Sequence, residues 1–513
     1  MHSAVLPGIR AGCTRMILPA FLFLFYAAPA LGQASAETWQ NLDKLVRDMP
    51  AFNKGFTGFI LYDPEKKQRL SGWNDDKYFT PASNTKIFTF LTATLLLPGD
   101  SLPLAHYEVI GDTLLFWGAG NPAWLHPELP LPDPLTPLLK AWPGPVFYTD
   151  RPFKTERFGP GWAWDDYPDN YQVERTPMPA YANLVEFHRL SDTSEVVAFP
   201  AFFRDSVTID NSAGEDTPDL ERAEFANKFK LKKRLPFDFS EATPYRYSSG
   251  LMAGLLSDTT GRQIRLWRGA LPRYEKPQTL FMPAPDTIYK RLMQDSDNFI
   301  AEQLILQCSD RLFGVQDAGR MLRYARDTLI AGAPDQFYWN DGSGLSRYNL
   351  FTPRSVVYAL EQLYYLIPRE RLFATFPAGG VSGTIQGLYE GPGGKPYVFA
   401  KTGTLRNKHC LSGYLVAQSG KVYIFSFMHN NFTGSSTPIK KGMNTILRWI
   451  RERGCGGCWG LPAVALGLWR TGDAATLRRG GWGLDTGDWR LDAGGWILDW
   501  MLDTGDWILP TAN

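Results

Sequence analysis

Three short motifs hold the side chains of this sequence that could do chemistry together. They are, in chain order, Ser83-Asn-Thr-Lys86, Ser296-Asp-Asn298 and Lys401-Thr-Gly403. Each is weak alone, since Ser-x-x-Lys is expected roughly twice by chance in a chain of this length. Their order, and the kind of element expected around each, match what serine acyl transfer requires.

The first motif could supply a nucleophile and its base. A serine hydroxyl is a poor nucleophile at neutral pH, so Ser83 needs a neighbouring group to take its proton. Lys86 lies one helical turn away and can do so if its pKa is lowered, which burial and a second cation, Lys401, would achieve. The motif therefore predicts an acyl-enzyme on Ser83.

The second motif could complete the proton path and hold the substrate. Ser296 would relay the proton to the leaving amine, and the Asn298 amide would hold the peptide backbone of the substrate. The backbone N–H groups of Ser83 and Thr404 are the candidates for an oxyanion hole.

The third motif predicts a site for a terminal carboxylate. The Lys401 ammonium and the hydroxyls of Thr402 and Thr404 would bind it through charge-assisted hydrogen bonds. Gly403 would let the substrate lie close along the strand.

Each motif also has an ordinary structural interpretation. Ser83 could be a residue at a helix N-terminus with Lys86 a solvated charge, residues 296–298 could be a helix cap, and 401–403 a turn. The joint occurrence of all three in this order favours the chemical interpretation.

Apolar periodicity indicates the elements that would carry these motifs. Pro81 suits a first helical turn, and the apolar residues after it suit a buried helix, which would place Ser83 and Lys86 on one face. The second motif falls within an expected helix, 286–307, and the third ends an expected strand, 397–401.

The remaining pattern predicts an α+β architecture. We expect a catalytic domain formed by residues 37–97 and 276–453, with residues 98–275 as an inserted, mainly β region. The other expected helices are 316–331, 353–366 and 438–453, and the other expected strands are 195–199, 206–209, 411–418 and 421–428.

The first 36 residues have the character of a secretory signal peptide. Arg10 and Arg15 precede an apolar run, 16–30, and Ala34-Ser35-Ala36 supplies a cleavage site. The run is short for a membrane span of about 20 residues. We therefore expect an exported, periplasmic or envelope-associated protein with at most peripheral membrane contact; an uncleaved anchor helix is the alternative.

The last segment, 454–513, repeats Leu484-Asp-Thr-Gly-Asp-Trp489 as Leu502-Asp-Thr-Gly-Asp-Trp507. So few irregular units could hardly bury a core of their own. We expect a disordered low-complexity tail, with sugar binding through its Trp residues as the alternative.

Charge and composition exclude several other classes. The net charge is +1, and removing residues 1–36 with their two arginines leaves 51 basic against 52 acidic residues, or −1, which argues against nucleic-acid binding. Cys455-Gly-Gly-Cys458 lacks a second pair of ligands, so a zinc or redox role there is only a minor alternative. His409 and His429 are interpreted as strand or loop residues, and no metal or organic cofactor is expected.

With these three motifs, the sequence resembles the class C low-molecular-mass penicillin-binding proteins, the D-alanyl-D-alanine carboxypeptidase/endopeptidase group. The resemblance covers about residues 40–453 and includes the separation of 213 positions between Ser83 and Ser296. Further matching segments are Gly161-Trp-Ala-Trp-Asp-Asp166, Asp341-Gly-Ser-Gly-Leu-Ser-Arg347, Gly379-Gly-Val-Ser-Gly-Thr384 and Ser412-Gly-Tyr-Leu415.

This resemblance implies a β-lactamase/transpeptidase-like catalytic domain, with a five-stranded antiparallel sheet flanked by helices and one or two small inserted domains. It implies hydrolysis of peptidoglycan peptides ending in D-Ala-D-Ala, or of their cross-links, and acylation of Ser83 by β-lactams. A β-lactamase or esterase on the same scaffold, and a non-catalytic wall-binding protein, are the alternatives.

The resemblance also points to residues that would bind the substrate's diamino acid. By motif match, Asp165 or Asp166 and Arg347 would lie near the free end of that side chain; a helix-capping or structural ion-pair role is the alternative for each. Ser382 stands where the family pattern often has Asp, so no carboxylate role is carried over there.

Overall fold

The computed structural model describes residues 35–454, apart from residues 98, 191–194, 213, 215–216, 270–276 and 284. All of these belong to one folded unit of the chain. The expected signal peptide up to Ala34, Cys455-Gly-Gly-Cys458 and the repeat tail lie outside the described residues. Ser35 caps the first helix, α1 (Ala36–Arg47), by accepting the Thr38 N–H at 3.2 Å.

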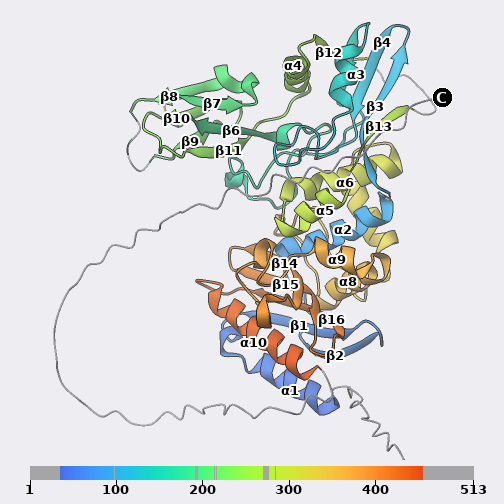
Figure 1. Cartoon of the computed structure of the whole chain (residues 1–513), viewed down its shortest axis with the longest axis vertical. Helices are drawn as coiled ribbons and strands as arrows, with labels where there is room; N and C mark the ends of the chain where they lie inside the picture. Colours follow the sequence, from blue (N-terminus) through green and yellow to red (C-terminus); the bar gives the residue numbers. More distant parts are fainter. Residues whose placement is uncertain are drawn as a thin grey trace, which may run out of the picture. The chain divides into compact units, whose positions relative to one another are not determined.

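The catalytic domain is built on a five-stranded antiparallel sheet, as the resemblance implied (Figure 1). Its order is β14-β15-β16-β1-β2, so β1, from the start of the chain, pairs with β16, from its end. The strands are β1 (Phe56–Asp63), β2 (Gln68–Trp73), β14 (Val398–Leu405), β15 (Lys408–Val416) and β16 (Val422–Asn430). The two segments of the expected catalytic domain therefore form a single sheet.

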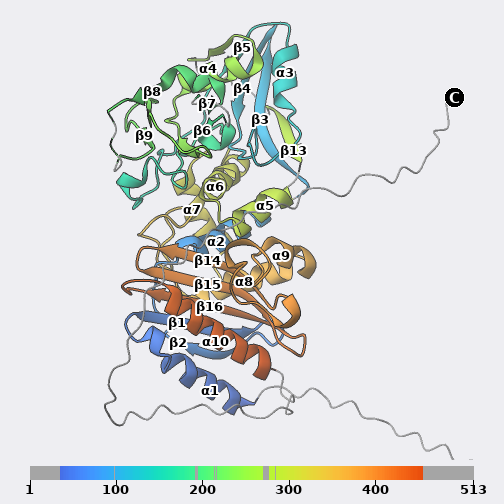
Figure 2. The same ribbon diagram turned by 60° about the vertical axis from the view of Figure 1, so that its left-hand side comes forward.

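Helices cover both faces of this sheet, because side chains alternate along its strands. Phe59 and Leu61 belong to the apolar core on the side of α1 and α10 (Thr437–Arg453), whereas Ile60 belongs to the core on the opposite side. Figure 2 shows α1 and α10 together against the sheet. The other layer contains α2 (Thr85–Leu96), α5 (Pro285–Gln294), α6 (Asn298–Phe313), α7 (Ala318–Tyr324), α8 (Pro353–Leu366) and α9 (Arg369–Thr375).

The spacing of apolar residues explains how these helices lie. In α10 the buried residues recur at helical intervals, which makes one face apolar and leaves the other polar; they are Ile439, Gly442, Met443, Ile446, Leu447 and Ile450. In α2 every residue from Thr85 to Ala93 is buried, so this helix runs through the interior.

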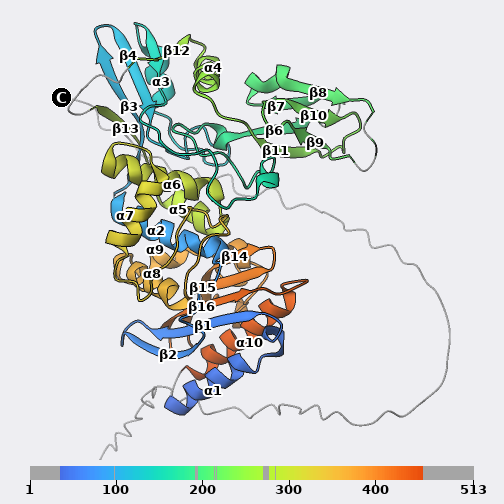
Figure 3. The ribbon, with the colours of Figure 1, turned by 180° about the vertical axis from the view of Figure 1, so that it is seen from behind.

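The inserted region is mainly β, as expected, and its described residues include two α-helices (Figures 1 and 3). One sheet has the order β12-β5-β4-β3-β13, and two further sheets have the orders β11-β6-β7 and β8-β10-β9. The elements are β3 (Ser101–Ile110), β4 (Thr113–Gly118), α3 (Leu135–Ala141), β5 (Val146–Tyr148), β6 (Leu184–Arg189), β7 (Val196–Phe199), β8 (Val207–Asp210), β9 (Leu220–Arg222), β10 (Phe229–Lys232), β11 (Ser240–Pro244), α4 (Ser249–Thr260), β12 (Ile264–Leu266) and β13 (Gln278–Pro283).

The two ends of the insertion lie side by side. Its first strand, β3, pairs antiparallel with its last, β13. The inserted sheet therefore extends to Pro283, beyond the predicted boundary at residue 275. Because the chain leaves and re-enters the catalytic domain at one place, a large insertion can be accommodated without disturbing the catalytic sheet.

Two expected elements are wrong in detail. The helix expected over 286–307 is interrupted, because Ser296 has a left-handed backbone (φ 62°) and Asp297 starts a new helix. The strand expected to end at Lys401 continues to Leu405, so the third motif lies inside β14 rather than at its end.

Within the described part of the chain, none of the helices combines the length and the apolar character needed to cross a membrane.

Candidate active site

Ser83 lies in a 3-10 turn (Ala82–Asn84) immediately before α2, which begins at Thr85 and not, as expected, with a first turn at Pro81. The turn is tied to the sheet by the Asn84 side chain. Its Nδ2 donates to the Lys401 carbonyl at 2.8 Å, and its Oδ1 accepts from the Ser412 hydroxyl at 2.7 Å. Ser83 is thereby fixed against β14 and β15.

Two glycines allow this close approach. A Cβ on Gly403 would lie 2.5 Å from the Pro81 carbonyl oxygen and 3.0 Å from the Ser83 nitrogen. Gly344 has a left-handed backbone (φ 89°), and a Cβ there would lie 2.0 Å from the Ala82 carbonyl oxygen. Gly403 is therefore required for the packing of β14 on the Ser83 turn, a constraint that the sequence argument had assigned to substrate alone.

Lys86 is fully buried, and its ammonium is directed at Ser83. Its Nζ lies 3.0 Å from the Ser83 Oγ, 2.5 Å from the Asn298 Oδ1 and 2.7 Å from the Ser343 carbonyl oxygen. Three oxygens around one Nζ hold the side chain in a single position.

Burial shifts the pKa of both lysines. It lowers the pKa of Lys86 to about 8, although the carboxylates of Asp341, Asp297 and Glu302 act in the opposite direction. The pKa of Lys401 is lowered well below its usual value, first by burial and then by the positive charge of Lys86. A base that is partly unprotonated near neutral pH is what the first motif needs.

The second motif lies between the end of α5 and the first residue of α6. Asp297 caps α6 by accepting the Ile300 N–H at 2.8 Å, so the helix-cap interpretation is correct for this residue. Asn298 uses both ends of its amide: its Oδ1 accepts from Lys86, and its Nδ2 donates to the Tyr171 carbonyl of the inserted region at 2.9 Å. The cap and the polar site are therefore built from adjacent residues.

A pocket of about 260 Å³ brings residues of all three motifs together. Ser83, Ser296, Thr402 and Thr404 all line it. Lys86, Asn298 and Lys401 lie behind this lining. In particular, the Lys401 Nζ donates to the Thr402 carbonyl at 3.0 Å, so the hydroxyls of the third motif, rather than its ammonium, face the cavity.

Sequence reasoning missed four residues of this lining, namely Thr384, Leu388, His409 and Lys440. Thr384 accepts a hydrogen bond from the Thr402 hydroxyl at 2.8 Å, and it ends one of the matching segments, which was the available signal. His409 is a strand residue of β15, as interpreted, but its Nδ1 lies 2.9 Å from the Thr404 Oγ1. Its position across the β14–β15 ladder could not be read from spacing alone.

The residues predicted to bind the diamino acid are placed differently. Asp165 and Asp166 lie in a 3-10 turn (Trp164–Asp166), and the Arg347 N–H donates to the Gly161 carbonyl at 3.2 Å, which joins the two segments. None of the three lines the pocket around Ser83. Asp165 and Arg347 are exposed.

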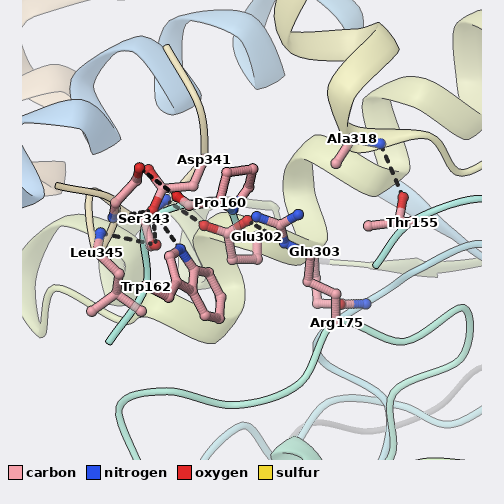
Figure 4. A network of polar contacts seen from close by, with 12 residues as sticks. Thr155, Pro160, Trp162, Arg175, Glu302, Gln303, Ala318, Asp341, Ser343 and Leu345 are labelled. Carbon is pink, nitrogen blue, oxygen red and sulfur yellow. Dashed lines mark hydrogen bonds and ion pairs between the residues drawn. The ribbon is translucent and has the colours of Figure 1, made fainter. Parts of the chain in front are cut away.

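The inserted region also supports the loop that holds Lys86 (Figure 4). Buried Glu302 accepts the Ser343 N–H at 2.7 Å and the Arg175 Nε–H at 2.8 Å. Buried Asp341 accepts from the Trp162 indole N–H at 2.8 Å and from backbone N–H groups of its own loop. Arg175 and Trp162 of the insertion thus anchor Ser343, whose carbonyl holds Lys86.

Comparison with known proteins gives relatives whose sequences align with most of this chain. The D-alanyl-D-alanine carboxypeptidase DacB of Haemophilus influenzae is 25% identical over 437 residues, which cover 77% of this chain and 89% of that protein. A D-alanyl-D-alanine carboxypeptidase of Actinomadura sp. is 25% identical over 480 residues, which cover 83% and 88%.

A solved structure supports the fold independently. The crystal structure of penicillin binding protein 4 (dacB) from Haemophilus influenzae has a TM-score of 0.64 at 20% identity, and the match covers 80% of this chain and 99% of that one. The same protein has also been solved in complex with a β-lactam, with a TM-score of 0.61. The β-lactamase/transpeptidase-like fold is confirmed.

The family model described as D-Ala-D-Ala carboxypeptidase 3 (S13) matches residues 143–452, more than half of the chain. Together with the fold and the convergence of the three motifs on one pocket, this match assigns the protein: the chain belongs to the D-Ala-D-Ala carboxypeptidase 3 (S13) family of serine carboxypeptidases.

Proposed function

We propose that this chain hydrolyses peptidoglycan peptides ending in D-Ala-D-Ala, or their cross-links, through an acyl-enzyme on Ser83 in the cell envelope. The observation that carries the proposal is the 3.0 Å separation of the Lys86 Nζ from the Ser83 Oγ, beside a pocket that the other two motifs help to line. A binding protein has no need of a nucleophile paired with a buried base.

Acylation would begin with attack of the Ser83 Oγ on the carbonyl carbon of the penultimate D-Ala. The hydroxyl proton passes to the unprotonated Lys86 Nζ as the C–O bond forms. The backbone N–H groups of Ser83 and Thr404 stabilise the oxyanion of the tetrahedral intermediate. When the C–N bond breaks, Ser296 donates its proton to the departing amine and regains one from the Lys86 ammonium. Lys86 is then unprotonated again, and the acyl group remains as an ester on Ser83.

Deacylation would restore the enzyme. Lys86 takes a proton from water, whose oxygen attacks the ester carbonyl, and the Ser83 oxygen leaves and regains a proton. The products are a carboxylic acid and the free hydroxyl. A β-lactam acylates Ser83 in the same way, but its amine stays attached to the adduct after the ring opens, so the ester would persist.

Substrate orientation would depend on the third motif and on Asn298. The hydroxyls of Thr402 and Thr404 line the pocket and would bind the terminal carboxylate, while Lys401 behind them contributes to the local field. Asn298 would hold the peptide backbone of the acyl half. Asp165, Asp166 and Arg347 are proposed to bind the diamino acid further from Ser83.

Acylation by labelled penicillin tests this proposal. Wild-type protein should label covalently, and Ser83→Ala should not label while keeping the wild-type circular dichroism spectrum. Strong labelling of Ser83→Ala would overturn the assignment. Rapid turnover of a chromogenic cephalosporin without release of D-Ala from a peptide would identify a β-lactamase instead.

A further inference from the structure

The pocket around Ser83 continues into a second cavity of about 390 Å³. The two cavities share Leu388 and Lys440, so they are neighbours along one surface. The second cavity lies between the segment after Thr384 and α10, which supplies Lys440, Lys441 and Arg448 to its lining. None of these three residues belongs to the catalytic motifs.

With Thr402 and Thr404 as the proposed contacts of the terminal carboxylate, we infer that the second cavity lies on the leaving-group side of Ser83. Thr402 and Thr404, the proposed carboxylate contacts, belong to the first pocket, and Thr404 is bonded to His409. The ammonium of Lys440 is close enough to His409 to help burial lower the pKa of this imidazole to about 4. The path from Ser83 therefore runs past the carboxylate site and a neutral histidine to Lys440 and then into the second cavity.

The charge of this cavity is positive. Lys440, Lys441 and Arg448 line it against a single carboxylate, Glu390. Among the described residues, neither Lys440 nor Lys441 has an ion-pair partner. By contrast, Lys421, which directly precedes β16, forms an ion pair with Asp63 at 2.6 Å. Unneutralised cations around a concave surface attract an anion.

The walls also have unused hydrogen-bonding capacity. The Tyr389 hydroxyl and the Asn444 Oδ1 are buried and find no hydrogen-bond partner in the described part of the chain, and both residues line the cavity. Buried polar groups normally have partners. Their presence here suits a cavity that takes a polar ligand.

We propose that this basic pocket, defined by Lys440, Lys441 and Arg448, binds a carboxylate of the departing strand of a cross-linked peptide. The inference rests on the proposed function of Ser83. A departing D-Ala carries one carboxylate, which the third motif already binds, whereas the amine half of a cross-link carries further carboxylates beyond it. The pocket thus favours cross-linked over monomeric substrates; in both, the bond broken is the amide at the D-Ala carbonyl.

The test compares two substrates on one enzyme. In the double variant Lys441→Gln/Arg448→Gln, the ratio of kcat/KM for a cross-linked muropeptide dimer to that for a monomeric D-Ala-D-Ala peptide should fall about tenfold, since each exposed charge contributes up to about 1 kcal/mol. For wild-type protein the same ratio should fall as ionic strength rises. Lys44→Gln/Lys54→Gln, which also removes two positive charges from exposed sites, should leave the ratio as in wild type.

A second substrate identifies the group that is bound. When the carboxylates of the departing strand are amidated, wild-type protein should lose its preference for the dimer, and the double variant should no longer differ from it. A wild-type ratio in the double variant, with penicillin labelling of Ser83 intact, would overturn this inference alone. Absence of both labelling and peptide cleavage in wild-type protein would instead overturn the proposed function.

Discussion

The two polar regions near the substrate path are built in different ways. Around Ser83, Lys86 and Asn298 are held by hydrogen bonds from several elements, and Lys86 is fully buried. Around Asp165 and Arg347, the two segments are joined by hydrogen bonds from Trp162 to Asp341 and from Ser346 to the Pro160 carbonyl, but the Asp165 and Arg347 side chains themselves are exposed. The groups around Ser83 are thus preorganised, whereas the side chains proposed to bind the diamino acid are free to adjust.

Replacing Lys86 should lower the acylation rate more than any other change. A small effect would contradict the idea that the groups around Ser83 are preorganised for catalysis. In Lys86→Met, which keeps most of the side-chain volume, penicillin acylation should slow by about 10³-fold or more, because no other group takes the Ser83 proton. Stopped-flow or gel-based acylation rates measure this. A rate within tenfold of wild type would show that Lys86 is not the base.

Removing the ion pair between Arg175 and Glu302 should have the second-largest effect, a loss of unfolding free energy. Both side chains are nearly fully buried, so Arg175→Met should cost about 3 kcal/mol of unfolding free energy by leaving the Glu302 carboxylate unpaired. The double variant Arg175→Met/Glu302→Gln, which keeps an acceptor for the Ser343 N–H, should recover part of this loss. Urea denaturation measures the unfolding free energies, and equal stability of Arg175→Met and wild type would show that the Arg175–Glu302 ion pair does not anchor the Ser343 loop.

The pH dependence of acylation sharpens the account of Lys86. Only the unprotonated amine can accept the Ser83 proton, so the rate should rise with pH and level off above about 8, and below that it should fall about tenfold per pH unit. In Glu302→Gln the profile should shift to lower pH, because a carboxylate that raises the pKa of Lys86 is removed. A shift to higher pH would contradict the assignment.

The exposed region should give the smallest effect. Arg347→Gln should raise the KM for a peptide that carries the free diamino acid by about threefold, as expected of a single exposed charge. Acylation by penicillin, which lacks the diamino acid, should change less. An equal loss with both compounds would show that Arg347 supports the fold of its loop.

The contrast also explains how far the sequence could be interpreted. The positions of Ser83, Lys86 and Asn298 could be predicted because a serine nucleophile, its lysine base and a nearby amide require particular residue types in recognisable motifs. The break at Ser296 was not, since its left-handed backbone interrupts an otherwise helical pattern. His409 and Lys440 reach the pocket only through the pairing of β15 with β14 and the packing of α10, which are tertiary facts without a local signature.

Mapping the penicilloyl adduct by mass spectrometry tests the central claim most directly, because the claim is that segments far apart in the chain fold around one reactive hydroxyl. After incubation with penicillin and digestion, the account predicts one stoichiometric adduct on the peptide containing Ser83, lost in Lys86→Met at matched exposure. A stoichiometric adduct on any other residue would contradict it.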